Sequence, residues 1–213
     1  MATKPKNTET EDTGERLINA AKAVFAEKGF AGSTVKQIAD LAGVNVSLIS
    51  YHFNGKDGLL RACLEKFGRE RLQDSETILT PPESREDLKA KLKLWMSQFL
   101  RCHAEDKNVC TIIHRENMME NEFLKELFES TFVKTFEAMV KFFESSRKKG
   151  ITRKEVDPTM AAHMIFGFMV HMGRNQEGMK KMLGVSIAEE KFRTHVAEQT
   201  IDILLNGVLR ESV

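Results

Sequence analysis

Residues 33–60 read STVKQIADLAGVNVSLISYHFNGKDGLL and contain two short helical patterns on either side of a tight turn. Ser33 or Thr34 offers a hydroxyl that can cap the first of these helices, and Gly43 ends it. Glycine allows the positive backbone dihedral that such a turn requires. Asn45 can cap the second short helix. The stretch therefore predicts a helix-turn-helix.

The second short helix has one side that can be buried and one that cannot. Val44, Ile49 and Phe53 can pack against Ile38, Ala39 and the helix before them. The opposite side would then face outward, and a short helix with outward-pointing N-terminal residues is the shape that enters a DNA major groove. The residues left on this outer side are Val46, Ser47, Leu48, Ser50, Tyr51 and His52.

The same stretch resembles the DNA-binding signature of TetR-type transcriptional regulators. In that signature a threonine precedes an Ile-Ala pair, an Ala-Gly-Val turn follows, and an aromatic end leads to Phe-x-x-Lys-x-x-Leu-Leu. The matching residues here are Thr34, Ile38-Ala39, Ala42-Gly43-Val44, Tyr51-His52-Phe53, Lys56 and Leu59-Leu60. The resemblance covers roughly residues 13–64. It implies an all-α fold, with a helix-turn-helix domain followed by a helical ligand-binding and dimerisation domain.

The resemblance also implies which residues meet DNA. Thr34 matches a position that binds phosphate at a helix N-terminus, and Lys56 matches a phosphate-contacting lysine beside the next helix. Ser47 and Ser50 depart from the usual glycine and tyrosine, and Tyr51 could take over the tyrosine's phosphate contact. The partly apolar base-facing set suggests contacts with thymine methyl groups. The expected DNA-binding residues are Thr34, Lys36, Gln37, Asn45, Val46, Ser47, Leu48, Ser50, Tyr51, His52 and Lys56.

The amino-acid composition limits the classes of protein to which the chain can belong. The chain of 213 residues carries 32 basic and 31 acidic side chains, so DNA binding must rest on local pattern and not on net charge. Three cysteines make no disulfide framework, and we expect a cytoplasmic protein. We expect no signal peptide, because residues 1–12 are polar, and no apolar run is long enough for a membrane span. No catalytic constellation has usable spacing, so we expect neither an enzyme nor a cofactor or metal site.

Apolar periodicity extends the helical prediction to the whole chain. We expect a disordered arm over residues 1–12, a helix-turn-helix domain over 13–57 and a sensing and dimerisation domain over 58–213. Thr13 is the expected N-cap of the first helix, which Gly29 should end. The later helices are expected at about 56–78, 83–103, 109–119, 121–149, 158–175 and 188–209.

The second domain should hold both an effector pocket and a dimer interface. The last two helices are apolar over more than one face, which favours a homodimer through these helices. Methionine and phenylalanine make adaptable apolar linings, although ordinary core packing is the alternative for each such residue. The expected ligand-binding residues are Trp95, Met96, Phe99, His103, Ile112, Ile113, Arg115, Phe132 and Phe136.

Two smaller features leave alternatives open. Arg115 and Glu116 could anchor a polar ligand group or hold helices together, and we favour the structural role. Cys110 and His114 lie four residues apart, a spacing that suits a metal, and Cys102 with Cys110 could be a redox pair. Nothing in the sequence fixes the geometry of either arrangement.

These features predict a ligand-responsive repressor that binds a palindromic DNA operator as a homodimer. A small apolar or amphipathic effector, whose identity the sequence does not give, would release it. Movement of the helix expected at about 56–78 would change the distance between the two DNA-binding domains of the dimer. The alternative is an all-helical lipid or small-molecule carrier that does not bind DNA.

Overall fold

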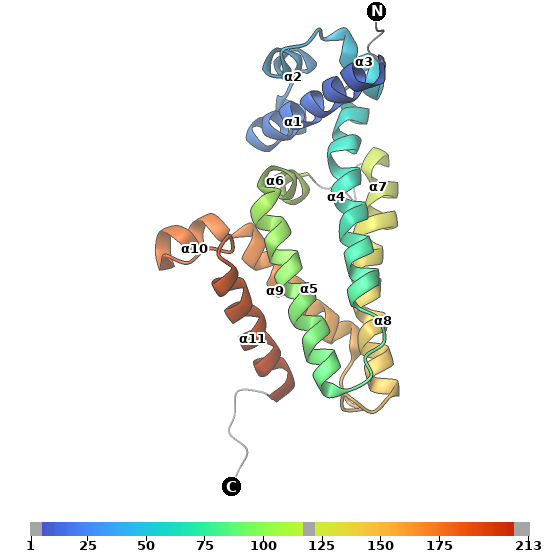
Figure 1. Ribbon diagram of the computed structural model, residues 1–213, viewed down its shortest axis with the longest axis vertical. Helices are drawn as coiled ribbons and strands as arrows, with labels where there is room; N and C mark the ends of the chain where they lie inside the picture. The colour runs from blue at the N-terminus through green and yellow to red at the C-terminus, as the bar shows by residue number, and fades with distance from the viewer. Residues whose placement is uncertain (1–5, 117–121, 207–213) are drawn as a thin grey trace, which may run out of the picture. The chain divides into compact units, whose positions relative to one another are not determined.

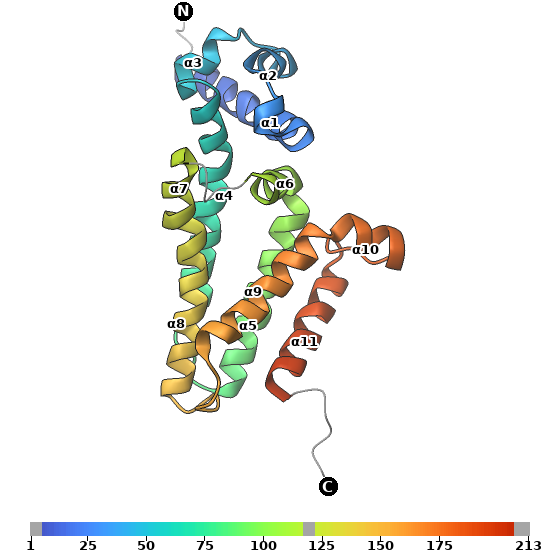
Figure 2. The ribbon, with the colours of Figure 1, turned by 180° about the vertical axis from the view of Figure 1, so that it is seen from behind.

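The computed structural model describes residues 6–116 and 122–206, with the backbone alone at residues 6–12 and 123, and the described chain is all-α (Figures 1 and 2). A π-helical turn over Glu129–Val133 separates α7 from α8. The helices are α1 Lys6–Gly32, α2 Val35–Ala42, α3 Ser47–Phe53, α4 Lys56–Ile78, α5 Arg85–Glu105, α6 Lys107–Arg115, α7 Glu122–Phe128, α8 Lys134–Lys148, α9 Pro158–Arg174, α10 Gln176–Leu183 and α11 Glu190–Asn206.

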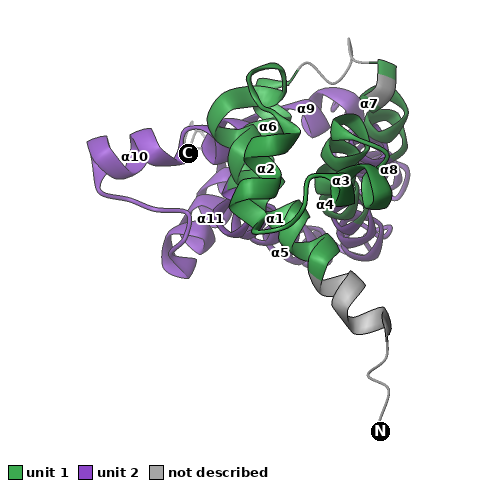
Figure 3. Ribbon diagram, turned by 90° about the horizontal axis from the view of Figure 1, so that it is seen from above, with its two compact units in different colours: residues 1–69, 108–130 green, residues 70–107, 131–213 purple. Residues whose placement is uncertain are grey.

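The chain divides into two compact units, coloured separately in Figure 3. Unit 1 comprises residues 1–69 and 108–130, and unit 2 comprises residues 70–107 and 131–213. This division differs from the expected boundary between residues 57 and 58. The first turns of α4 belong to the helix-turn-helix unit, in which Leu59, Leu60 and Leu64 are buried. The segment carrying α6 and α7 also returns to unit 1.

Unit 1 is built on the apolar face of α1. Leu17, Ala21 and Phe25 are fully buried, as their helical spacing predicts. The break expected at Gly29 is confirmed, because this residue has φ 76° and ψ 165° inside the bounds of α1. The expected disordered arm is wrong for residues 6–12, which are helical, so Thr13 lies inside α1 and is not its N-cap.

Unit 2 is a helical bundle in which α5 packs against α9 and α11, and α8 packs against α9. Two of its predicted apolar helices, α5 and α9, are confirmed and begin at side-chain caps. Ser84 Oγ accepts the N–H of Asp87 at 3.1 Å, and Asp157 Oδ1 accepts the N–H of Met160 at 2.9 Å. The core that these helices enclose includes Leu88, Leu92, Met96, Met139, Phe142, Ala162, Ile165, Met169 and Ala197.

Two elements differ from the sequence prediction. The single helix expected over 121–149 is interrupted by the π-helical turn, and the chain passes from unit 1 to unit 2 within it. The short helix α10 lies in a segment where we expected a loop. It spans only eight residues, so the apolar pattern of Met179, Met182 and Leu183 is too short to distinguish it from a loop, and Gly184 ends it in the left-handed region.

Candidate DNA-binding surface and sensing core

Reciprocal capping fixes the start of α2. Thr34 Oγ1 accepts the N–H of Gln37 at 3.2 Å, and Gln37 Oε1 accepts the N–H of Thr34 at 3.1 Å. This capping box satisfies two amide groups that a helix N-terminus otherwise leaves unpaired. At the other end Gly43 adopts φ 64°, and its N–H donates to Asp40 O at 3.2 Å. The turn between α2 and α3 therefore has the predicted chemistry.

Arg16 closes the same turn from α1. Its guanidinium Nη2 donates to Ala42 O at 2.6 Å and to Gly43 O at 3.2 Å, which satisfies carbonyls at the end of α2. Sequence reasoning missed this role. No local signal marks it, because residue 16 lies more than twenty-five positions from the turn that it holds.

The recognition helix α3 rests on one buried side chain. Among the residues of α3, Ile49 alone is fully buried, while Tyr51 keeps 77% of its surface exposed. The N-cap of α3 is Val46 and not the expected Asn45, although Asn45 Oδ1 accepts the N–H of Ser47 at 2.9 Å. The other expected DNA-facing residues are exposed or half-buried in unit 1: Lys36, Gln37, Val46, Leu48, Ser50 and His52.

Lys56 has a structural partner set that the resemblance did not imply. Its Nζ donates to Phe30 O at 2.6 Å and to Ser33 O at 2.8 Å, and lies 4.3 Å from the centre of the Phe30 ring. Two of the three ammonium donors are therefore directed at the last residues of α1 and the loop that follows it. In this conformation Lys56 braces that loop.

Gly58 is a second residue that the sequence reasoning did not single out. It lies in the first turn of α4, and a Cβ placed on it would come within 1.7 Å of Phe53 O. Phe53 is the last residue of α3. The absence of a side chain at position 58 is what lets the recognition helix and α4 approach so closely.

An aromatic cluster occupies unit 2 between α5, α8 and α9. The ring of Trp95 lies 5.1 Å from Phe99 and 5.6 Å from Phe166, and Phe99 stacks on His103 at 4.4 Å. Phe136 joins this cluster through Phe166, because the centres of their two rings lie 5.7 Å apart. Four of the expected ligand-binding residues are thereby brought together, and α9 contributes Phe166, which the sequence reasoning did not select.

A polar wall borders this aromatic cluster. Trp95 Nε1 donates to Ser75 Oγ at 2.8 Å, and this hydroxyl donates to Arg71 O at 2.9 Å. The Arg71 guanidinium pairs with Asp74 at 2.8 Å, and Gln98 lies 3.5 Å from the same carboxylate oxygen. These residues, with Phe99 and Thr135, line a small void of about 10 Å³. The candidate sensing core thus combines flat apolar faces with a paired arginine and carboxylate.

The remaining expected ligand residues lie elsewhere. Met96 is fully buried among the core residues of unit 2, and Phe132 is half-buried in the π-helical turn. Ile112, Ile113 and Arg115 belong to α6 in unit 1. Arg115 Nη1 donates to Ala26 O at 3.2 Å and to Glu27 O at 3.1 Å, which is a structural role.

The cysteines are buried as thiols. Burial raises the pKa of Cys63 to about 12 and that of Cys102 to about 11. A thiol protonated at neutral pH is a weak nucleophile and a weak metal ligand, which disfavours redox sensing through Cys102. Among the side chains that the structure describes, those of residues 13–116, 122 and 124–206, no three His, Cys, Asp or Glu residues are grouped so that they could hold a metal ion.

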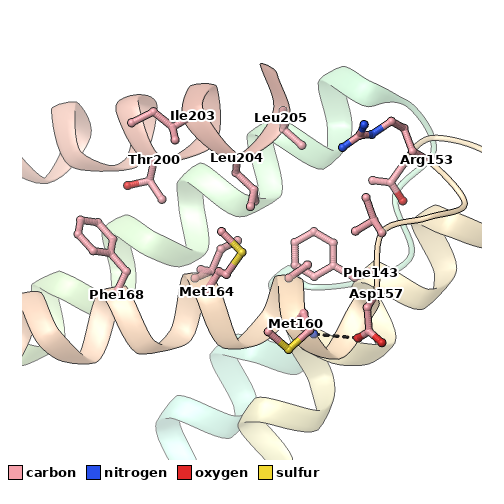
Figure 4. Close-up of a pocket in the computed structure, with 14 residues that line it drawn as sticks. Phe143, Arg153, Asp157, Met160, Met164, Phe168, Thr200, Ile203, Leu204 and Leu205 are labelled. Carbon is pink, nitrogen blue, oxygen red and sulfur yellow. Dashed lines mark hydrogen bonds between the residues drawn. The ribbon is translucent and has the colours of Figure 1, made fainter. Parts of the chain in front are cut away.

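The outward faces of α9 and α11 form an open apolar groove of about 570 Å³ (Figure 4). Met160, Met164 and Phe168 lie along one wall, and Ile203 with Leu204 lies on the other. Met160 and Met164 expose 60% and 61% of their surfaces, and Ile203 exposes 52%. Large apolar side chains gathered in this way mark a surface suited to a partner.

Comparison with known proteins matches both parts of the chain. Residues 17–63 match the family model described as bacterial regulatory proteins, tetR family, and residues 89–204 match a tetracyclin repressor-like C-terminal domain. Within the described residues, no helix is both long and apolar enough to cross a membrane.

Individual relatives are distant. The chain is 27% identical to the probable regulator YttP of Bacillus subtilis over 57% of this chain and 58% of that protein. It is 22% identical to the transcriptional repressor NicS of Pseudomonas putida over 93% of both chains. The fold is similar to that of Bacillus subtilis FadR in complex with stearoyl-CoA, with TM-score 0.72 and 20% identity over 92% of this chain and 99% of that one.

Proposed function

Because this chain belongs to the TetR family of bacterial transcriptional regulators, we propose that it is a repressor that binds a palindromic operator as a homodimer and releases it when a small effector binds unit 2. Two recognition helices would lie in successive major grooves about 34 Å apart. The carrier alternative is not proposed, since the family consists of regulators.

The observation that carries the DNA-binding part is that α3 is buried on one side only. Ile49 is fully buried on one side, whereas Ser47, Ser50 and Tyr51 are exposed on the other. The capping box of α2 and the Arg16 contacts hold the preceding turn. A rigid helix that leaves polar and aromatic side chains outward supports contact with base edges and phosphates.

The test begins with DNA selected from a random library by the purified protein. Tyr51→Ala should weaken binding of the selected operator by about tenfold, the equivalent of one lost polar contact of about 1.4 kcal/mol. Lys36→Ala should lower the slope of log affinity against log salt by about 1. The control is Lys154→Ala, which replaces an exposed lysine of unit 2 and should change neither the operator affinity nor its salt dependence. Equal affinity in all of these variants would refute α3 and α2 as the reading surface.

The apolar groove between α9 and α11 supports the proposed homodimer. A two-fold interface needs one self-complementary surface, and two outward helical faces can form a four-helix contact with a second copy. We expect Met164→Glu with Phe168→Glu to yield monomers in sedimentation velocity. The control Leu94→Glu changes an equally exposed apolar residue of α5 and should remain dimeric. A double variant that sediments as the wild type would assign the groove to another occupant, such as an effector.

The proposed effector site is the aromatic cluster around Trp95 with its polar wall. Aromatic faces suit an apolar or amphipathic ligand, and the Arg71–Asp74 pair offers both a donor and an acceptor. Acyl-CoA, the class of ligand in the FadR structure, is one candidate to screen. The void is small in this conformation, so entry of a ligand requires the surrounding helices to move.

A further inference from the structure

Arg115 and Glu116 hold the broken end of α1 at the backbone. In an unbroken α-helix the N–H of Phe30 would donate to Ala26 O, four residues earlier. The dihedrals of Gly29 interrupt this ladder. The structure instead directs Phe30 N–H to Glu116 Oε1 at 2.9 Å, and Arg115 Nη1 to Ala26 O at 3.2 Å.

Gly29 fits this arrangement on two grounds. Its φ of 76° lies in the region that side-chain-bearing residues avoid. A Cβ at this position would also lie 3.4 Å from Arg115 Nε, so the guanidinium rests directly on the glycine backbone. We call Arg115 and Glu116 the α1 latch, since their two side chains contact adjacent groups of one corner.

The corner that the latch holds leads into the helix-turn-helix. On its other side Lys56 Nζ donates to Phe30 O and Ser33 O, so both backbone polar groups of Phe30 contact charged side chains. Ser33 immediately precedes the capping residue Thr34 of α2. A displacement of the latch would therefore act on the start of α2.

Arg115 of the latch is the last residue of α6, a short helix whose first residue belongs to unit 2. The chain passes between the units after Lys107, the first residue of α6. In unit 2 Lys107 Nζ pairs with Glu177 at 2.8 Å, and His103 O accepts Gln176 Nε2 at 3.1 Å. His103 itself stacks on Phe99 of the aromatic cluster.

We propose that Arg115 and Glu116 are positioning residues that link operator binding by unit 1 to the packing around Trp95 in unit 2. The inference rests on the proposed function, because it needs an operator. Coupling between two binding events is reciprocal, so DNA bound to unit 1 must change unit 2 as much as an effector in unit 2 changes DNA affinity. The coupling can therefore be measured without knowing the effector.

Trp95 makes this measurement direct, because it is the chain's single tryptophan and lies in the aromatic cluster. The experiment titrates the selected operator into the wild-type dimer and records Trp95 emission. We expect an emission shift in the wild type and in Glu116→Gln, which keeps a carbonyl acceptor for Phe30 N–H. The double variant Arg115→Ala with Glu116→Ala should still bind the operator but lose the shift. Arg69→Ala, an exposed arginine of unit 1 paired with Glu65 on its own helix, is the control and should retain it.

Each remaining outcome is decisive. A wild-type shift that persists in the double variant, or a wild-type protein that binds its operator without any shift, overturns the coupling role. If the double variant does not fold by circular dichroism, the single variant Glu116→Ala replaces it, with the same expected loss. A wild-type protein that selects no DNA refutes the proposed function instead, so the two failures are distinguishable.

Discussion

Gly58→Ala should weaken operator binding although alanine is the better helix former. A Cβ at position 58 would lie 1.7 Å from Phe53 O and 2.9 Å from Phe53 C. Contacts of a Cβ under 3.0 Å are essentially never seen, so the gap between the carbonyl oxygen and the new Cβ must open by roughly 1.3 Å. Because Phe53 ends α3, the recognition helix moves with it.

The expected losses of stability and of operator affinity both follow from this displacement. Overpacking costs about 1–3 kcal/mol, against a gain of about 1 kcal/mol when alanine replaces glycine inside a helix. We therefore expect a net loss of up to about 2 kcal/mol in the free energy of unfolding. A base contact is worth about 1–3 kcal/mol, so losing one through the shift should weaken operator binding by at least about fivefold. Denaturant titration and fluorescence anisotropy measure the two quantities.

Gly178→Ala is the matched control, since Gly178 is also the third residue of its helix, α10, and a Cβ there meets nothing within 4 Å. This variant should gain about 0.5–1 kcal/mol of stability and keep wild-type affinity. The reasoning is refuted if Gly58→Ala behaves like Gly178→Ala, with higher stability and undiminished DNA binding.

Four further predictions concern caps and buried groups. Thr34→Ala removes the α2 cap and should lower the free energy of unfolding by about 1 kcal/mol, and an unchanged thermal melt would contradict this. Because burial raises the pKa of Cys63 to about 12 and of Cys102 to about 11, both should resist alkylation at pH 8 in native protein, and rapid labelling seen by mass spectrometry would contradict their burial. The stability that these protonated thiols contribute is fully present below the unfolded pKa near 9 and is lost as pH rises toward 11–12. Denaturant titrations should therefore show a free energy of unfolding that falls above pH 9, and a flat pH profile would contradict this expectation. Ser75→Ala leaves the buried Trp95 N–H without its acceptor and should cost about 1–3 kcal/mol, a loss that denaturant titration would detect or exclude.

The helix-turn-helix could be predicted because its determinants are local. The cap at Thr34, the left-handed turn at Gly43 and the burial of Ile49 each depend on residues a few positions apart. Arg16 and Glu116 could not be predicted in this way. Each reaches backbone groups that are distant in sequence, and a charged side chain that contacts a distant carbonyl or amide leaves no periodic pattern.

The sensing core could be predicted only in part, for the same reason. Helical spacing on α5 identified Trp95 and Phe99, which the structure brings together with Phe136. Their polar neighbour Ser75 lies twenty positions from Trp95 and had no sequence signal. Arg115 was included among the ligand residues as half of a charged pair, and its contacts with α1 support the structural role that the sequence analysis favoured.

The central claim is that two copies of this chain present two α3 helices to one DNA duplex. Hydroxyl-radical footprinting of the wild-type protein on its selected operator tests it directly. We expect two protected half-sites about 10 base pairs apart, related by two-fold symmetry. A single unpaired protected tract, or no protection at concentrations where the proposed dimer is formed, would contradict it.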